Sequence, residues 1–493
     1  MKFIIFFASI LIQITSSVAQ SSYFITFSND SDELCNSVIE DSFSNLIGVG
    51  RSCTDLTQVQ TFRGIIWKIS EDNDTISKYF SFNDTSCYFN FVEEKNDGYH
   101  IIGTFFSPPS FSTSGLIHIQ LDTNLNIISK NIIVYHNTLL LVDNKIKHLG
   151  NEYYLICEEE TASTSYDCII KLDNNLNLLN FYTLWEEKAK LMDCLLSPDS
   201  SEFWLFSNSY NYYAGPELIR FDSNFVLIEV KNFPFRYFPG TWDWEVFYKG
   251  NLTAQWFSDS KFLIGCNHEQ SFNNQQIIEE SIGYSLLDSS MNFAPIQYLN
   301  SPDTVDYAAF FTNFNFVDTN QIFVCGIKNV TPEFFPIEPS WIIAGKLNNT
   351  LETIYIRYYG GDARYWAYSI VSTLDGGSII SLQRYDHLTQ NNERDVSFLK
   401  LDSNGLITGS SSIEINHKSL IVFPNPASHS LTIQTESNNG ELNIYSLEGR
   451  LLKTISFYQQ NFEVDIDNFT AGMYVCEVID SKGFKSFTKF IKN

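Results

Sequence analysis

Basic residues are scarce in this chain. Its 493 residues include 31 Lys and Arg against 57 Asp and Glu, which gives a formal net charge of −26. A nucleic-acid-binding protein needs a basic surface that displaces counterions from phosphate, and docking on anionic lipid needs one too. The composition therefore argues against nucleic acid and against an anionic membrane surface as partners.

Long apolar runs are also missing. The longest run near the N-terminus covers residues 3–14, with Lys2 before it and Ser17-Val18-Ala19 after it. A helix that crosses a bilayer needs about 20 apolar residues, whereas a shorter run between a basic residue and small residues is typical of a secretory signal peptide. We predict that residues 1–19 are a signal peptide cleaved after Ala19, and that the mature chain has no transmembrane segment.

Motifs that carry familiar chemistry are absent as well. The nine cysteines include no CxxC pair, so zinc is not predicted, and we expect no other cofactor. HExxH, GxSxG, a P-loop and a complete GxGxxG do not occur. The eight histidines are scattered, and a carboxylate pair drawn from distant segments cannot be recognised in a sequence. No catalytic residue can be assigned.

The cysteines allow two interpretations. Cys157 and Cys168 flank a predicted hairpin turn at matching distances from its centre, so they could form a cross-strand disulfide in an oxidising compartment. Alternatively, cysteines such as Cys157, Cys194, Cys266 and Cys325 lie within apolar strands, where cysteine behaves as a small buried hydrophobe. The second interpretation covers more of the cysteines, and the odd total leaves at least one outside any intramolecular pair.

A strand-and-turn signature, seen in IQLDTNLN and IKLDNNLN, occurs seven times in the body of the chain. Its copies are 49–66 residues apart, and their turns open at Ser70, Asp122, Asp173, Asp222, Asp288, Asn348 and Asp402. A basic residue stands two positions before the turn in five copies, as Lys68, Lys171, Arg220, Lys346 and Lys400. A second apolar strand precedes every signature at a similar distance. The chain is therefore built from seven similar units.

Each unit holds four short strands separated by Gly, Asn, Asp and Ser turns. Four strands in a unit of about 40 to 60 residues are typical of a propeller blade. We predict an all-β fold in which residues 20–417 form a seven-bladed β-propeller. The segment 23–30 resembles the fourth strand of the first unit, so we expect it to join the last blade and close the ring. Whether residues 411–416 share that sheet is left open.

The Asp-Asn turns also have two interpretations. Residues 173–177, Asp-Asn-Asn-Leu-Asn, place oxygen ligands at alternate positions as a calcium loop does, but the Gly and Glu that complete such a loop are missing. Asp and Asn also favour tight turns through local hydrogen bonds. We expect turns without a metal.

A different pattern begins at residue 419. Residues 419–493 contain short strands with glycine at the turns, a pattern that indicates a small Ig-like β-sandwich. Four motifs follow in order: Phe423-Pro424-Asn425-Pro426-Ala427-Ser428, then Asn443 to Gly449-Arg450, then Ala471-Gly472-Met473-Tyr474-Val475, and a basic terminal strand, Lys489 to Lys492. Together they resemble the type A C-terminal sorting domain of the type IX (Por) secretion system. His429 and Cys476 depart from the usual pattern.

The resemblance implies a route of export. The signal peptide would carry the chain through the inner membrane, and the C-terminal domain would engage the type IX machinery for passage across the outer membrane. The protein would then be secreted or attached to the cell surface of a Gram-negative bacterium. Pro424, Asn425, Pro426, Gly449, Gly472 and Tyr474 would carry the sorting motif. The alternative is a stability or binding domain without a sorting role.

Aromatic residues in predicted loops suggest ligand binding by the propeller. Loops between blades, and between second and third strands, share one face of a propeller, and they include Phe106, Tyr210, Tyr212, Trp242, Trp244, Phe334 and Trp366. Such rings can stack on a sugar or anchor a peptide. We expect a glycan or protein ligand at the cell surface. An alternative is that the rings pack between blades. The alternative functions are an extracellular glycan hydrolase with carboxylates from different blades, and a non-binding structural protein.

Overall fold

The computed structural model describes residues 22–493 apart from short segments. The segments outside the description are 29–30, 54–61, 82–84, 96–97, 107–113, 137–138, 161–164, 184–188, 210–215, 233–234, 238–243, 247–250, 272–277, 289, 291, 293–295, 300–303, 331–337, 389–392, 408–411, 417–419, 436, 447–449 and 481–484. The predicted signal peptide, residues 1–19, also lies outside the described residues. Every regular element in the described part is a β-strand. That part contains no helix long and apolar enough to cross a membrane.

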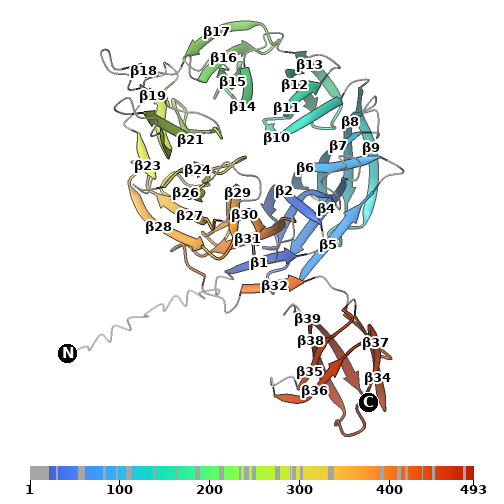
Figure 1. Cartoon of the computed structure of the whole chain (residues 1–493). Coiled ribbons are helices and arrows are strands. Elements are labelled where there is room, and N and C mark those ends of the chain that lie inside the picture. Colours follow the sequence, from blue (N-terminus) through green and yellow to red (C-terminus); the bar gives the residue numbers. More distant parts are fainter. Residues whose placement is uncertain are drawn as a thin grey trace, which may run out of the picture.

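Within the described residues, the chain before residue 417 forms seven sheets, S1 to S7, that follow one another around a ring (Figure 1). The first four have four antiparallel strands each. S1 has β2 (Asp32–Glu40), β3 (Leu46–Cys53), β4 (Arg63–Ile69) and β5 (Thr75–Phe80); S2 has β6 (Ser86–Lys95), β7 (Gly98–Phe106), β8 (Ser114–Leu121) and β9 (Ile127–His136). S3 has β10 (Leu139–Leu149), β11 (Glu152–Glu160), β12 (Ser165–Asp173) and β13 (Leu178–Thr183); S4 has β14 (Ala189–Leu196), β15 (Glu202–Ser209), β16 (Pro216–Asp222) and β17 (Leu227–Asn232).

The last three sheets have extra strands. S5 has β18 (Phe235–Tyr237), β19 (Trp244–Val246), β20 (Thr253–Ser258), β21 (Lys261–Ser271), β22 (Ile278–Asp288) and β23 (Gln297–Leu299). S6 has β24 (Asp306–Ala308), β25 (Phe314–Asn315), β26 (Ile322–Lys328), β27 (Trp341–Leu347) and β28 (Thr353–Gly360). S7 has β29 (Arg364–Ser372), β30 (Ser378–Tyr385), β31 (Asp395–Leu401), β1 (Tyr23–Ser28) and β32 (Ser412–Asn416). The two strands predicted in all seven units are present in every sheet.

The two ends of this region meet in S7. Strand β1 pairs antiparallel with β31, with Tyr23 opposite Lys400, and parallel with β32. The prediction that the N-terminal segment joins the last sheet is confirmed, and the question left open for residues 412–416 is answered, because they form the outer strand of the same sheet. Ile25 and Phe27 of β1 are fully buried against S1 and S7 residues.

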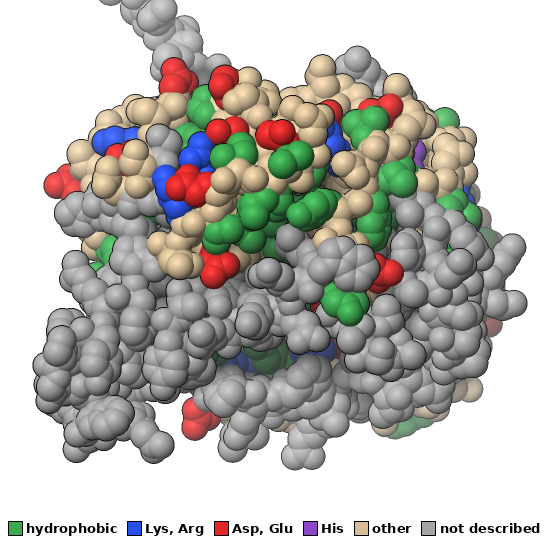
Figure 2. Space-filling model, turned by 90° about the horizontal axis from the view of Figure 1, so that it is seen from above, with side chains coloured by type: hydrophobic (Ala, Val, Ile, Leu, Met, Phe, Trp, Pro, Cys, Tyr) green, Lys and Arg blue, Asp and Glu red, His purple; other side chains and the backbone are tan. Residues whose placement is uncertain are grey.

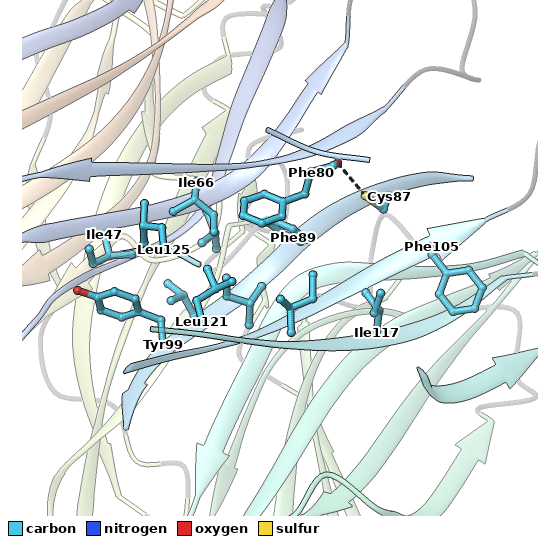
Figure 3. Close-up of a cluster of buried hydrophobic side chains, with 14 residues drawn as sticks. Ile47, Ile66, Phe80, Cys87, Phe89, Tyr99, Phe105, Ile117, Leu121 and Leu125 are labelled. Carbon is cyan, nitrogen blue, oxygen red and sulfur yellow. Dashed lines mark hydrogen bonds between the residues drawn. The ribbon is translucent and has the colours of Figure 1, made fainter. Parts of the chain in front are cut away.

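The hydrophobic core lies between neighbouring sheets. Figure 3 shows such a cluster, in which Ile47 and Ile66 of S1 face Phe89 and Tyr99 of S2. A sheet packed between two others buries both of its faces, so its middle strands are buried at successive positions rather than at alternate ones. Strand β30 is buried along its whole length.

The repeated Asp-Asn turns hold themselves by local hydrogen bonds. Asp122 Oδ1 accepts the amide protons of Asn124 at 2.9 Å and Asn126 at 2.7 Å. Leu125 between them has φ of 63°, in the left-handed region, and its side chain is buried in the S1–S2 core. The turns at Asp173, Asp222 and Asn348 repeat this, with positive φ at Leu176, Phe225 and Leu351 respectively. The carboxylates are therefore used inside the turns, as the turn interpretation predicts.

The basic residue before the turn links adjacent sheets. Lys68 of S1 donates to the carbonyl of Thr123 in the S2 turn at 2.9 Å, and Lys346 of S6 donates to Ser403 in the S7 turn at 3.1 Å. In S3, the Lys171 ammonium lies 6.0 Å from the ring centroid of Phe225 in the S4 turn. These contacts give the repeated lysine a structural role.

The C-terminal region forms two further sheets around its own core. One has β33 (Leu420–Phe423), β34 (Ser430–Thr435) and β37 (Asn461–Asp465); the other has β35 (Gly440–Ser446), β36 (Leu451–Phe457), β38 (Gly472–Asp480) and β39 (Lys485–Lys492). Leu431, Ile444, Cys476 and Phe490 lie in that core.

All nine cysteines are buried thiols. Cys157 and Cys168 stand directly opposite each other in the β11–β12 register, as the predicted hairpin requires, and both are fully buried in the core between S2 and S3. No disulfide joins them in the structure, which agrees with the buried-hydrophobe interpretation.

Candidate functional site

Seven aromatic residues were predicted as ligand contacts, and the structure describes the side-chain burial of two of them, Phe106 and Trp366. Of these two, Trp366 is the one that is partly exposed. It lies near the start of β29, opposite Gln383 of β30, and is half-buried. Two guanidinium groups flank its ring: Arg364 Cζ lies 5.7 Å and Arg394 Cζ 6.0 Å from the ring centroid. Cations at this distance from an indole face are attracted by its quadrupole. We call Trp366 with Arg364 and Arg394 the Trp366 site.

Arg394 is fixed by a carboxylate from the far end of the chain. Its Nε and Nη2 donate to the two carboxylate oxygens of Asp32 at 2.7 and 2.6 Å, and both side chains are mostly buried. The backbone amide of Glu33 also donates to the Arg394 carbonyl at 2.8 Å. A bidentate pair of this kind holds a guanidinium in one orientation, so the S1–S7 junction positions one flank of the Trp366 site.

A second arginine cluster lies on strands β29 and β30. Arg384, opposite Tyr365 in the β29–β30 register, donates to Asp362 at 3.3 Å and Asp386 at 3.2 Å. The Tyr365 hydroxyl donates to Asp362 at 2.9 Å. Because successive residues of a strand point to opposite faces, this cluster lies on the other face of S7 from Trp366.

Tyr368 extends the site along β29. A register shift between Ala367 and Ser369 marks a β-bulge at this residue, and its hydroxyl donates to Gln383 Oε1 at 3.0 Å. Burial raises the pKa of Tyr368 to about 12, with opposing effects from nearby Arg394 and Arg51. Tyr368 therefore keeps its proton at neutral pH and acts as a hydrogen-bond donor.

The arrangement is suited to binding. The carboxylates described here, Asp32, Asp362 and Asp386, each accept hydrogen bonds from a guanidinium. At the Trp366 site the Arg394–Asp32 pair lies beside a partly exposed indole ring, and a flat apolar surface with fixed polar groups beside it is how proteins orient polar ligands.

The structure does not bring the seven predicted aromatics together. Phe106 ends β7 and is buried against Phe62 and Tyr88, with centroids 6.2 and 6.1 Å away, so packing accounts for its ring. Trp244 begins β19, opposite Tyr237 and Ser271. The remaining predicted residues, Tyr210, Tyr212, Trp242 and Phe334, lie outside the described residues.

Sequence reasoning missed the arginines. Arg394 and its partner Asp32 are 362 positions apart, so no local motif joins them. One signal was available, because Arg364 stands two positions before Trp366 on a strand and therefore shares its face. Because the chain has only 31 basic residues, an arginine on the same strand face as a tryptophan is uncommon and could have indicated the site.

The sorting-motif residues have structural roles where they are described. Asn425 Oδ1 accepts the amide proton of Ile491 at 2.9 Å, and its side-chain amide donates to the Lys489 carbonyl at 3.2 Å. Tyr474 donates to the Thr470 carbonyl at 2.6 Å and stacks on Phe490. Pro424 and Pro426 are exposed, Gly472 begins β38, and Gly449 lies outside the described residues. The motif therefore ties the entry segment of the domain to its terminal strand.

Residues 421–493 match the family described as "Secretion system C-terminal sorting domain". No curated protein matches the chain.

Several solved structures share limited similarity with it. A subtype N10 neuraminidase-like protein of A/little yellow-shouldered bat/Guatemala aligns with 9% identity over 76% of this chain and 94% of its own, at a TM-score of 0.34. The polysaccharide lyase Uly1 aligns with 7% identity over 80% and 94%, at 0.41. PorZ, a surface component of the type-IX secretion system of Porphyromonas gingivalis, aligns with 8% identity over 88% and 69%, at 0.22.

The family match agrees with the four ordered motifs and with the Asn425 contacts that hold them together. Residues 421–493 are a C-terminal sorting domain of the type IX secretion system, and the protein is therefore secreted across the outer membrane of a Gram-negative bacterium, to the medium or to the cell surface.

Proposed function

We propose that residues 20–417 form a seven-bladed β-propeller that binds a glycan or protein ligand at the cell surface, and that residues 419–493 form a small Ig-like β-sandwich that directs its export. Support for the propeller comes from the seven sequence signatures, the seven described sheets arranged around a ring (Figure 1), and the N-terminal strand inserted into the last sheet. Closure of a ring in this way protects the sheet edges.

The observation that carries the binding proposal is the Trp366 site. An indole face can stack on the C–H groups of a sugar, while guanidinium and carboxylate groups beside it bond the hydroxyls. Arg394 beside the ring, paired with Asp32, provides both kinds of group, whereas Arg364 is fully buried and packs against the ring. A glycan is therefore the ligand to test first.

The other predicted aromatics belong to the same proposal. From the sequence, Trp242, Tyr210, Tyr212 and Phe334 are predicted in loops between sheets or between second and third strands, whereas Trp244 begins the short strand β19. In a propeller such loops open on the face that carries the start of β29. Longer loops on one face are where binding residues often gather.

Glycan and peptide arrays probed with purified residues 20–493 test the proposal. We expect glycan binding that Trp366→Ala weakens about fivefold, since one aromatic contact contributes about 1 kcal/mol beyond its buried area. Trp256 is a matched control, because it is also half-buried but donates to Leu196 in the S4–S5 packing, so Trp256→Ala should lower stability and leave binding intact. Silence on both arrays would favour a structural role, and product formation from a bound glycan would favour a hydrolase.

A further inference from the structure

The outer strand of S4 exposes apolar side chains to solvent. Strand β17 is the last strand in the order of that sheet, and among the described residues nothing pairs with its outer edge. Leu227, Ile228 and Val230 on this strand, with Val226 just before it, are 47–60% exposed. Figure 2 looks onto this rim, and hydrophobic side chains gather there with acidic side chains around them.

Neighbouring outer strands show the same feature. Ile127 and Ile128 begin β9, and Leu178 and Leu179 begin β13, at the same position after the repeated turn; all four are about half exposed. An edge strand with apolar side chains and unpaired backbone groups is a template for another strand. The outer strands β9, β13 and β17 could therefore each pair with another strand, and their charged residues decide which partner fits.

Antiparallel pairing of one strand with its own copy places residues opposite each other in a fixed pattern. Consider two copies of β17 paired about a two-fold axis that passes through Val230. Glu229 of each copy then stands opposite Lys231 of the other copy. Opposite charges in directly facing positions stabilise a pair of strands. The edge of β17 is therefore complementary to itself.

The outer strands of S1, S2, S3 and S6 lack this property. Strands β5, β9 and β28 each carry one basic residue and no acid, namely Lys78, Lys130 and Arg357, and β13 carries no charge. A single basic residue near the axis of such a pair would face its own copy, which is unfavourable.

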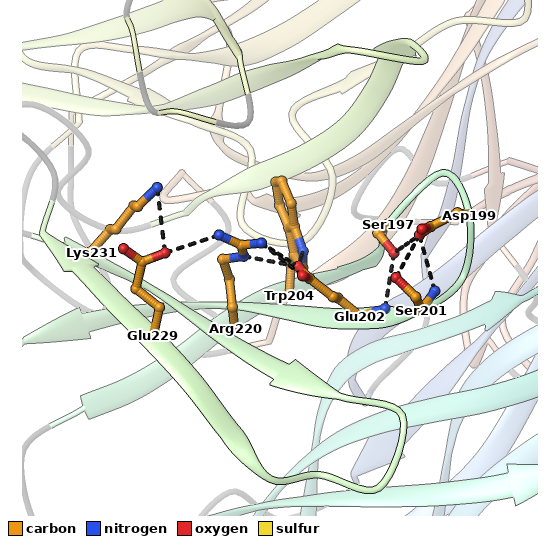
Figure 4. Close-up of polar contacts among 8 residues, drawn as sticks. All are labelled: Ser197, Asp199, Ser201, Glu202, Trp204, Arg220, Glu229 and Lys231. Carbon is orange, nitrogen blue, oxygen red and sulfur yellow. Dashed lines mark hydrogen bonds and ion pairs between the residues drawn. The ribbon is translucent and has the colours of Figure 1, made fainter.

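The charges of β17 are already held in position within one chain. Arg220 of β16 donates to Glu229 at 2.9 Å and makes a bidentate pair with Glu202, while Lys231 lies 3.5 Å from Glu229 (Figure 4). Arg220 fixes the Glu229 carboxylate at the edge, and 41% of that side chain stays exposed. The looser contact leaves Lys231 free to reach a second carboxylate.

We propose that two copies of this protein associate through antiparallel pairing of their β17 strands. A six-residue strand buries less than the roughly 800 Å² per partner of a standard interface. The dimer is therefore weak, with a dissociation constant on the order of 10 to 100 μM.

Sedimentation velocity of residues 20–493 over a range of concentrations tests the proposal. We expect a monomer at about 1 μM and a growing dimer fraction towards about 100 μM. Val230→Lys, which places two lysines across the axis at an exposed position, should abolish the dimer. The matched control, Leu179→Lys at the exposed edge of β13, should leave it unchanged.

Exchanging the charges at positions 229 and 231 distinguishes loss of strand pairing from misfolding of a variant. Glu229→Lys alone and Lys231→Glu alone should each be monomeric, because like charges face each other across the axis. An equal mixture of these two variants restores both opposite pairs and should recover the dimer. A monomer at every concentration, a dimer that survives Val230→Lys, or a mixture that stays monomeric would overturn the proposal.

Discussion

At the scale of single residues, the repeated turns place leucine or phenylalanine where glycine is usual. Leu125, Leu176, Phe225 and Leu351 have φ near 60°. An L-residue pays roughly 1–2 kcal/mol for this conformation, and burial of its side chain between two sheets offsets that cost. The last copy has Gly405 at this position with φ of 72°.

Leu176 makes this balance testable. Leu176→Ala should lower the free energy of unfolding by about 2–3 kcal/mol, because the side chain is buried in the S2–S3 core. Leu176→Gly loses one more methyl group but relieves the left-handed strain, so it should be as stable as the alanine variant or more so. Chemical denaturation measures both, with the exposed Leu179→Ala as a control that changes little. A glycine variant clearly less stable than the alanine variant would contradict the account.

The cysteines give a second prediction at this scale. Burial raises the pKa of Cys35 and Cys194 to about 12, so little thiolate is present at neutral pH. We expect a thiol reagent to label none of the nine cysteines in the native protein and all nine after unfolding without reductant. A disulfide between Cys157 and Cys168 would reduce the second count to 9 − 2 = 7.

At the scale of elements, the strands and turns follow closely from sequence. Alternation such as Ile117, Ile119 and Leu121 predicts a strand, and β8 is observed there. Asp122 and Asn126 predict a turn, because their hydrogen bonds join residues only four positions apart. The site could not be predicted in this way, since Arg394 and Asp32 belong to sheets at opposite ends of the chain.

Strand β1 joins the N-terminal end of this region to its last sheet. Its Phe27 is fully buried and packs edge-on against Phe398 of β31, with centroids 6.0 Å apart. Phe27→Ala should therefore lower the free energy of unfolding by about 3–5 kcal/mol. Phe43→Ala is the control, because Phe43 lies exposed in the turn after β2 and should cost under about 0.5 kcal/mol. Equal effects in a denaturation experiment would show that β1 does not hold the ring closed.

At the scale of the whole molecule, the C-terminal domain should be sufficient for export. We expect residues 419–493, fused to a periplasmic reporter, to carry the reporter across the outer membrane of a type IX-competent cell. Asn425→Ala removes the contacts with the terminal strand at Lys489 and Ile491 and should reduce the exported fraction. Fractionation of cells and medium measures this, with a strain lacking the machinery as control. A reporter that stays in the periplasm of the competent strain would contradict the prediction.

The sequence by itself determined the strands, the turns and the sorting domain, because each depends on neighbours within a few residues or on motifs in a fixed order. Only the tertiary structure decided what those elements place together. The insertion of β1 into S7 brings Asp32 and Glu33 to Arg394, which fixes one flank of Trp366. Such contacts depend on how sheets distant in sequence pack side by side, and that packing is set by the buried surfaces of the whole ring rather than by any local pattern.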